Sequence, residues 1–226
     1  MKNKCYICGQ IEGKQENDLI SINLGEVEYI RRIIAENKLF ALIPSLGALN
    51  RGHSLICPKF HYRSIAEIPD VQFHEYEEFV NHVSLVLKNL YKKPIHFFEH
   101  GSNPNSDEIN CTVDHAHLHV IPADVKIDFN LLNNVYKWEK VNSHEDFKEL
   151  VKDKEYLYYR SPNDELYFSV AQSHKFESQY MRKVFANLLD RSDDWNWRDN
   201  PNVDFCSDDF IYMKEEFDKC LVNMYA

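Results

Sequence analysis

Hydrophobic and polar residues follow distinct periods along the chain, and these periods predict a definite order of elements. Residues 70–91 place apolar or aromatic side chains three or four positions apart, which predicts a long amphipathic helix. Residues 25–37 show the same spacing over a shorter stretch and also predict a helix. Apolar runs at residues 39–43 and 54–57, each followed by a proline, predict two strands joined by a hairpin.

The later elements follow from weaker patterns. Residues 95–98 and 112–121 predict two more strands, and the turn formers between them, 100–110, predict a loop at the mouth of a site. Beyond Pro122 the patterns predict, in order, a hairpin at 155–160 and 165–171, a helix from about 177 to 190, an irregular stretch at 193–201 and a last helix at 208–224.

Three histidines alternate with apolar residues in the strand predicted at 112–121. A strand has a period of two, so His115, His117 and His119 are expected on one face while Ala116 and Leu118 face the core. An imidazole that is buried without a partner is costly to desolvate. The row therefore favours metal coordination, anion binding, or acid/base and nucleophilic chemistry over simple packing.

Composition and charge exclude several classes of protein. With 226 residues and 44% hydrophobic content, the chain can bury a substantial core. Its formal net charge of −10 argues against extended nucleic-acid binding, although a small phosphate site remains compatible with it. No apolar run is long enough to cross a membrane and no signal-peptide pattern follows the first residues, so we expect no membrane association and a cytoplasmic protein.

Cysteine spacing gives a second chemical signal. The six cysteines do not have the pattern of a secreted disulfide framework, and only Cys5 and Cys8 form a motif, Cys-x-x-Cys. A redox dithiol is possible, but a tetrahedral zinc site is favoured, and it needs two further ligands. The candidates are His53, His61, His100 and the row of three histidines.

The residues His115-Ala-His117-Leu-His119-Val-Ile resemble the signature of the histidine triad (HIT) superfamily, in which three histidines alternate with apolar residues. Residues 40–45 and 52–61 are similar to the paired strands that precede the long helix of that family. The resemblance covers roughly residues 1–122. It implies an α+β fold with an antiparallel sheet and the long helix packed on it, and residues 123–226 are expected to form an α/β C-terminal extension of unknown role on the same core.

Some members of the superfamily bind zinc. The resemblance to them implies that this chain holds a structural Zn²⁺ with Cys5, Cys8, His61 and His115. Two thiolates and two neutral imidazoles neutralise the ion and leave no open position, so the metal is expected to pin the N-terminus rather than to take part in the reaction. His53 is the main alternative to His61. It matches a family position that hydrogen-bonds to the triad, which is why we assign His61 to the metal.

The resemblance also implies catalytic roles. His117 is expected to attack a nucleotide α-phosphorus, and His119 to bind phosphoryl oxygens or shuttle a proton, with His53 in support. Thr112 and Gly101, with nearby backbone amides, are expected to complete the substrate pocket. No role is assigned to Glu99, and His100 is expected at the surface.

Hydrolases of the superfamily usually carry histidine at the third triad position, where nucleotidyltransferases and phosphorylases usually carry glutamine, so His119 favours hydrolysis. The expected substrate is a nucleoside phosphoanhydride or phosphoramidate, cleaved to a nucleoside monophosphate through a nucleotidyl-histidine intermediate. Two alternatives stay open: a nucleotidyltransferase or phosphorylase, and a nucleotide-binding module without turnover. The family often forms homodimers, which we also expect here.

The sequence predicts structural rather than ligand-binding roles for an arginine and two tryptophans of the extension. Arg182, in the helix expected near residue 177, is predicted to pair with an acidic residue at the surface rather than to contact phosphate. Trp195 and Trp197 are predicted to hold the C-terminal segment to the core rather than to stack on a ligand.

Overall fold

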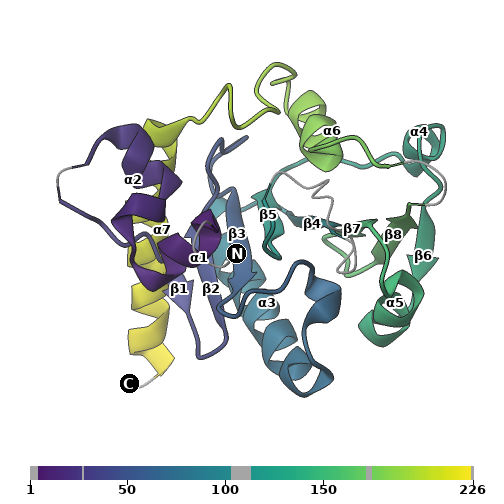
Figure 1. Cartoon of the computed structure of the whole chain (residues 1–226), viewed down its shortest axis with the longest axis horizontal. Coiled ribbons are helices and arrows are strands. Elements are labelled where there is room, and N and C mark those ends of the chain that lie inside the picture. Colours follow the sequence, from purple (N-terminus) through teal and green to yellow (C-terminus); the bar gives the residue numbers. More distant parts are fainter. Residues whose placement is uncertain (1–4, 27, 103–112, 172–174, 225–226) are drawn as a thin grey trace.

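The computed structural model describes residues 5–26, 28–102, 113–171 and 175–224 (Figure 1). Within them one antiparallel sheet of eight strands has the order β1-β2-β3-β5-β4-β7-β8-β6. The strands are β1 (Ala35–Glu36), β2 (Phe40–Pro44), β3 (Ser54–Pro58), β4 (Ile95–Gly101), β5 (Leu118–Pro122), β6 (Glu139–Val141), β7 (Tyr156–Arg160) and β8 (Leu166–Val170).

Helices surround this sheet. They are α1 (Tyr6–Glu12), α2 (Leu19–Leu24), α3 (Asp70–Tyr91), α4 (Phe129–Asn133), α5 (His144–Val151), α6 (Tyr180–Leu188) and α7 (Val203–Met224), with short 3-10 turns at Gln15–Asn17 and Ile65–Glu67. The α+β class is confirmed, and α3 covers the residues predicted for the long helix. In the described residues, no helix combines the length and the apolar character that crossing a bilayer requires.

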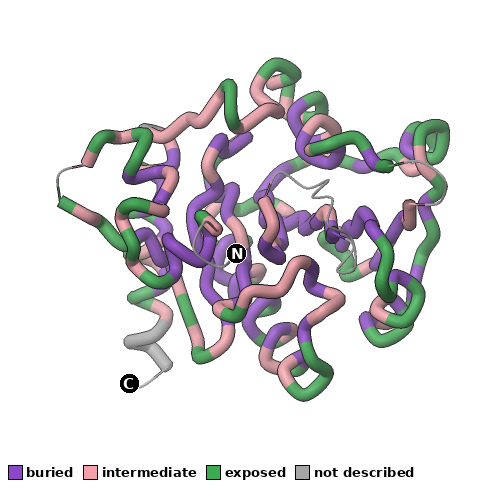
Figure 2. The backbone as a smooth tube through the Cα atoms, in the orientation of Figure 1, coloured by how far each residue is buried: buried purple, intermediate pink, exposed green. Residues whose placement is uncertain are grey.

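The two faces of the sheet bury different residues because side chains alternate along each strand. On β4, Phe97 joins the core that α3 covers, whereas Phe98 joins the core that α6 covers. On β7, Tyr158 and Tyr159 divide in the same way. Figure 2 shows buried residues following the central strands through the molecule. The sheet therefore lies between two apolar layers.

The C-terminal extension continues the same sheet. Strand β4 pairs with β5 on one side and with β7 on the other, so the predicted hairpin β7–β8 extends the sheet beyond Pro122. Helix α7 packs against α3 and β2, at the opposite end of the sheet from β8 (Figure 1). The irregular stretch at 193–201 is confirmed, and α7 begins at Val203, earlier than predicted.

The helix predicted over residues 25–37 is wrong. The described part of this segment has no helix, and only Ala35–Glu36 form a strand. Ile33 and Ile34 pack into two different clusters, which suits extended backbone rather than one helical face. Arg32, only 2% exposed, is held by the carboxylate of Glu26. Tertiary burial has overridden the local pattern.

The strand predicted over 112–121 is shorter than expected. Strand β5 begins at Leu118, so among the three histidines only His119 lies in a strand. The preceding segment is extended enough that Ala116 still faces the core with Leu118, and the amide of Ala116 donates to the carbonyl of Tyr62 at 2.7 Å. The alternation of core and site residues is therefore kept without regular strand pairing.

Candidate functional site

A cluster of two cysteines and two histidines brings the N-terminus against the triad. The ligand atoms of Cys5, Cys8, His61 and His115 all lie within 4.8 Å of one another. The Sγ of Cys8 is 3.3 Å from Nδ1 of His61 and 3.4 Å from Nδ1 of His115. Bonds of about 2.3 Å to sulfur and 2.0–2.1 Å to nitrogen at tetrahedral angles place such atoms about 3.5 Å apart. The cluster can therefore hold a tetrahedral metal ion.

The surroundings of the cluster favour the protonation states in which cysteine and histidine bind a metal. Cys5 is the N-cap of α1, and its sulfur accepts a hydrogen bond from the amide of Cys8. Hydrogen bonding with Cys8 and with His115 lowers the pKa of Cys5, which favours the thiolate. Nε2 of His115 donates to the carbonyl of Pro58 at 2.9 Å, so its Nδ1 lone pair is free to face the sulfurs.

His117 is oriented by the backbone of its neighbour. Its Nδ1 lies 2.6 Å from the carbonyl oxygen of His115, and a carbonyl can only accept, so Nδ1 carries the proton. The lone pair is therefore on Nε2. Desolvation lowers the pKa of His117 to about 4, so the ring is neutral at neutral pH. A neutral imidazole with a free lone pair at the wall of a pocket is a candidate nucleophile.

A second chain of hydrogen bonds fixes His119. The amide of Leu49 donates to Nδ1 of His53 at 3.0 Å, so the proton of neutral His53 is on Nε2. That Nε2 lies 2.9 Å from Nδ1 of His119, which must accept. Neutral His119 consequently carries its proton on Nε2. Burial lowers the pKa values of His53 and His119 well below 6.5, which keeps both rings neutral.

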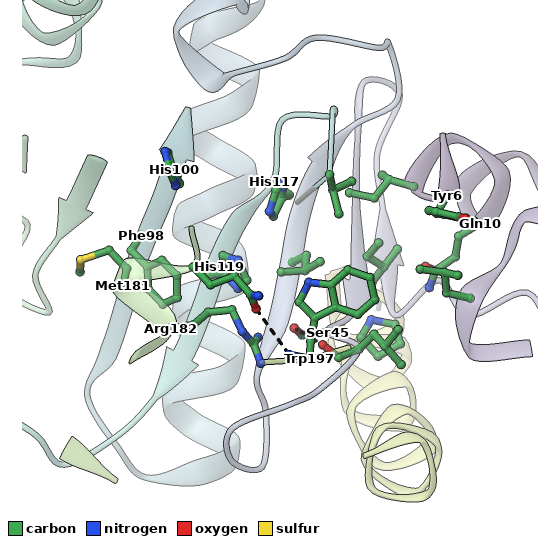
Figure 3. Close-up of a pocket in the computed structure, with 18 of the residues that line it drawn as sticks. Tyr6, Gln10, Ser45, Phe98, His100, His117, His119, Met181, Arg182 and Trp197 are labelled. Atoms are coloured by element: carbon green, nitrogen blue, oxygen red, sulfur yellow. Dashed lines mark hydrogen bonds between the residues drawn. The ribbon is translucent and has the colours of Figure 1, made fainter. Parts of the chain in front are cut away.

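These histidines open onto a pocket between the first half of the chain and the extension (Figure 3). Its empty space, including the part that is open to solvent, is about 860 Å³. His117 and His119 line it, and their ring centroids are 5.2 Å apart. The other described lining residues are Tyr6, Ile7, Gln10, Leu19, Ile43, Pro44, Ser45, Leu46, Leu55, Phe98, His100, Val113, Gln179, Tyr180, Met181, Arg182 and Trp197.

Arg182 does not pair with an acidic residue at the surface, so the sequence-based prediction is wrong. The side chain lines the pocket and is 3% exposed. Its Nη2 donates to the carbonyl of Gly47 at 2.6 Å and its Nε to the carbonyl of Trp195 at 2.8 Å. The amphipathic pattern predicted that Arg182 lies on a helix, which is α6. It did not show that the face of α6 carrying Arg182 meets the pocket.

The two tryptophans take different positions. Trp195 packs against the core beneath α6, as predicted. Trp197 lines the pocket, whereas the sequence predicted that it would hold the C-terminal segment to the core. It also lies against Gly47, whose φ is +67°, and a Cβ added there would be 2.5 Å from Cβ of Trp197. The extension is therefore closely fitted to the hairpin between β2 and β3.

Glu99 lies inside the protein beneath the triad segment. It is 1% exposed and accepts hydrogen bonds from the amide of Ile65 and the hydroxyl of Tyr156. Burial raises its pKa to about 8, in spite of these hydrogen bonds and one from the amide of His117. Glu99 thus supports the segment that carries His117, and it is not among the residues that line the pocket.

His100 is not at the surface, contrary to expectation. Its side chain is 12% exposed and its Nε2 lies 2.7 Å from the carboxylate of Glu155 in the extension. His100 also lines the pocket. Gly101, the last residue of β4, faces the ring of Tyr156 and is outside the lining, since a Cβ there would lie 2.2 Å from Cζ of Tyr156. Thr112 lies outside the described residues.

Comparison with known proteins gives distant relatives. The chain is 26% identical over 91 residues to an uncharacterized HIT-like protein of Methanocaldococcus jannaschii, a match covering 40% of this chain and 67% of that protein. It is 26% identical over 90 residues to an AP-4-A phosphorylase of Mycobacterium tuberculosis, covering 40% of this chain and 45% of that protein. The chain thus spans less than half the length of the phosphorylase it matches.

Solved structures are similar over part of the chain. A Hit-like protein involved in cell-cycle regulation from Bartonella henselae has a TM-score of 0.40 at 16% identity, covering 57% of this chain and 84% of that chain. A HIT family protein from Bacillus anthracis has a TM-score of 0.40 at 16% identity, covering 66% and 92%.

The family comparison identifies the segment that carries the triad. The profile of the HIT domain matches residues 26–126, which contain strands β2 to β5, helix α3 and His115, His117 and His119. The cysteine pair and the extension beyond residue 126 lie outside the matched segment. Residues 26–126 of this chain, which carry the triad, are therefore a HIT domain.

Proposed function

We propose that this protein is a nucleotide hydrolase that releases a nucleoside monophosphate through a covalent adduct on His117. The observation that carries the proposal is the pair of opposite tautomers in one pocket. His117 presents a lone pair on Nε2, whereas His119 presents a proton on Nε2. One ring is thus suited to attack phosphorus and the other to bind a phosphoryl oxygen.

The first step transfers the nucleotidyl group to the protein. Nε2 of His117 attacks the α-phosphorus, a P–N bond forms, the bond from phosphorus to the leaving group breaks, and the leaving group departs with the electron pair. An amine leaving group takes up a proton from solvent as it departs. In the second step, water attacks the same phosphorus. A P–O bond forms, the P–N bond breaks, its electron pair returns to Nε2 of His117, and the proton of the water passes to solvent.

The proposal assigns hydrogen bonding, rather than proton transfer, to His119. If His119 gave up its Nε2 proton, its Nδ1 would still be accepting from His53 and the ring would be an anion. Donation of a hydrogen bond to the nonbridging or leaving oxygen has no such cost. The charge of a phosphoryl-transfer transition state spreads over these oxygens, so a positioned donor stabilises it.

The Cys5, Cys8, His61 and His115 cluster is proposed to hold a structural Zn²⁺. Two thiolates and two imidazoles at tetrahedral spacing suit this metal, and a complete set of four protein ligands has no position for substrate. When bound, the ion would cross-link α1 to the segment that precedes His117. The residues of α1 that line the pocket, such as Tyr6 and Gln10, would then be fixed relative to the triad.

An intact-mass measurement tests the covalent step. The protein is incubated with diadenosine tetraphosphate or an adenosine phosphoramidate and quenched at alkaline pH, at which a phosphoramidate adduct survives. We expect an added AMP mass in the wild-type protein and none in His117→Ala. His74→Ala, which alters an exposed histidine on α3, is the matched control and should keep the adduct. Absence of both adduct and AMP release in the wild-type protein would contradict the proposal.

Transfer to phosphate is the second candidate reaction, because one relative is named an AP-4-A phosphorylase. In that reaction inorganic phosphate replaces water in the second step and the product is a nucleoside diphosphate. The two reactions are separated by product analysis with and without added phosphate. Hydrolysis predicts AMP under both conditions, whereas a phosphorylase predicts ADP and a rate that rises with phosphate.

A further inference from the structure

A buried arginine of the C-terminal extension lies at the pocket without a carboxylate partner among the described residues. We propose that Arg182 binds a second phosphoryl group, adjacent to the one that His117 attacks. The inference rests on the proposed function, and it narrows the substrate class to compounds or reactions that bring two phosphoryl groups to the site together.

The first argument is the cost of burying this charge. Arg182 is 3% exposed, and its described hydrogen bonds go to two backbone carbonyls, those of Gly47 and Trp195. Carbonyls orient the guanidinium but do not neutralise it. Buried cations in proteins are normally paired with an anion. An anionic ligand in the pocket would supply the missing charge.

The second argument is the composition of the pocket. Among the described lining residues there is no aspartate or glutamate, so Arg182 meets no competing carboxylate there. The two carbonyls occupy the Nε and Nη2 directions and hold the planar group in place. A guanidinium has five N–H donors, and those that remain suit phosphate oxygens. Arg182 is thus held in position for an anion before the anion arrives.

The position along the pocket distinguishes a second phosphoryl group from the first. Figure 3 shows His117, His119 and Arg182 following one another, with His119 between the other two. An α-phosphoryl group would be bracketed by Nε2 of His117 and Nε2 of His119. Arg182 lies beyond His119, so the oxygens it reaches belong to the neighbouring group.

Two kinds of compound can supply this second phosphoryl group. The second phosphoryl group can belong to the leaving group of a phosphoanhydride, or it can be free inorganic phosphate that accepts the nucleotidyl group. The leaving-group source predicts preference for a dinucleoside polyphosphate over a phosphoramidate with a neutral amine. The acceptor source predicts a rate that increases with phosphate concentration.

Binding measurements test the site without relying on turnover. Dissociation constants for AMP and ADP are measured by calorimetry on His117→Ala and on His117→Ala with Arg182→Gln. We expect ADP to bind more tightly than AMP in the first, and this preference to fall about tenfold or more when Arg182 is replaced, as for a lost charged hydrogen bond. Equal weakening of AMP and ADP, or no change, would overturn the proposal.

A matched arginine controls for loss of structure. Arg191 also donates to a backbone carbonyl of the β2–β3 hairpin, that of Leu49 at 2.8 Å, but it does not line the pocket. Arg191→Gln should therefore leave the ADP-over-AMP preference unchanged. If it lowers that preference as much as Arg182→Gln does, the effect is structural and the proposal fails.

Turnover measurements then identify the source. If the group is on the leaving side, Arg182→Gln lowers kcat/KM for diadenosine tetraphosphate at least tenfold more than for an adenosine phosphoramidate. If it is the acceptor, Arg182→Gln raises the KM for inorganic phosphate instead. If the wild-type protein shows no turnover but Arg182→Gln still removes the preference for ADP over AMP, the Arg182 site is supported and the proposed function is rejected.

Discussion

The amide of Leu49 and Nδ1 of His53 form a 3.0 Å hydrogen bond whose direction determines the protonation of the next ring. Because an amide can only donate, His53 must present its proton on Nε2, and His119 must accept it on Nδ1. A backbone group in the β2–β3 hairpin thus determines which nitrogen of His119 carries a proton at the pocket.

Replacing His53 should lower turnover while keeping the metal. In His53→Ala, His119 loses the donor that selects its tautomer, so the fraction of rings with a proton on Nε2 falls. We expect kcat to fall about tenfold, less than the 10²–10³ typical for removing a direct transition-state donor. Steady-state kinetics and metal analysis check this. A kcat equal to that of wild type would show that His53 does not control His119.

Removing a ligand of the cysteine–histidine cluster should release zinc and destabilise the fold. Cys5→Ser is expected to lose one zinc per chain and about 3 kcal/mol of unfolding free energy, because the link between α1 and His115 is broken. Metal analysis and denaturant unfolding measure both effects. Cys220→Ser, a half-buried free cysteine in α7, is the control. Unchanged metal content in Cys5→Ser would reject the assignment.

Glu99 should make stability depend on pH in a particular direction. Its pKa is raised from 4.5 to about 8 on folding, chiefly by burial, with Tyr156 and His100 as the neighbouring titratable groups. Between these values the folded state binds the proton and the unfolded state does not. Stability from this group is therefore present at low pH and is lost as pH rises from about 4.5 to 8, at up to about 1.4 kcal/mol per pH unit.

Unfolding by denaturant between pH 5 and 9 checks the contribution of Glu99. Glu99→Gln keeps a group that can hydrogen-bond but cannot ionise, so its stability should decline less with pH than that of the wild-type protein. Glu78→Gln, on the exposed side of α3, serves as the control. Parallel curves for wild type and Glu99→Gln would mean that Glu99 does not titrate in this range.

Two glycines with similar backbone angles separate backbone strain from packing. Gly25 has φ +62° with no atom within 4 Å of an added Cβ, whereas Gly47 has φ +67° and the Cβ would meet Trp197. Gly25→Ala should cost about 1 kcal/mol from the left-handed backbone alone. Gly47→Ala should cost about 2 kcal/mol more, because Trp197 must move. Thermal unfolding measures both, and equal losses would show that the contact with Trp197 is soft.

Local patterns were enough to predict much of the HIT domain. Helix α3 formed over the residues whose apolar spacing predicted it, and strands β2 and β3 formed within one residue of the prediction. The four residues Cys5, Cys8, His61 and His115 do meet, although they are far apart in the sequence. That grouping came from the family resemblance, since the spacing of residues left several histidines open as ligands.

The sequence by itself determined where the apolar faces lie and which chemical groups the domain carries, because helix and strand periods and the Cys-x-x-Cys and histidine patterns are local. The tertiary structure alone decided what surrounds those groups. It placed Arg182 and Trp197 of the extension at the pocket, buried Glu99, and replaced the expected helix before β1 with extended chain. Burial and hydrogen-bond partners depend on segments that are distant in the sequence, and they decide charge, tautomer and access.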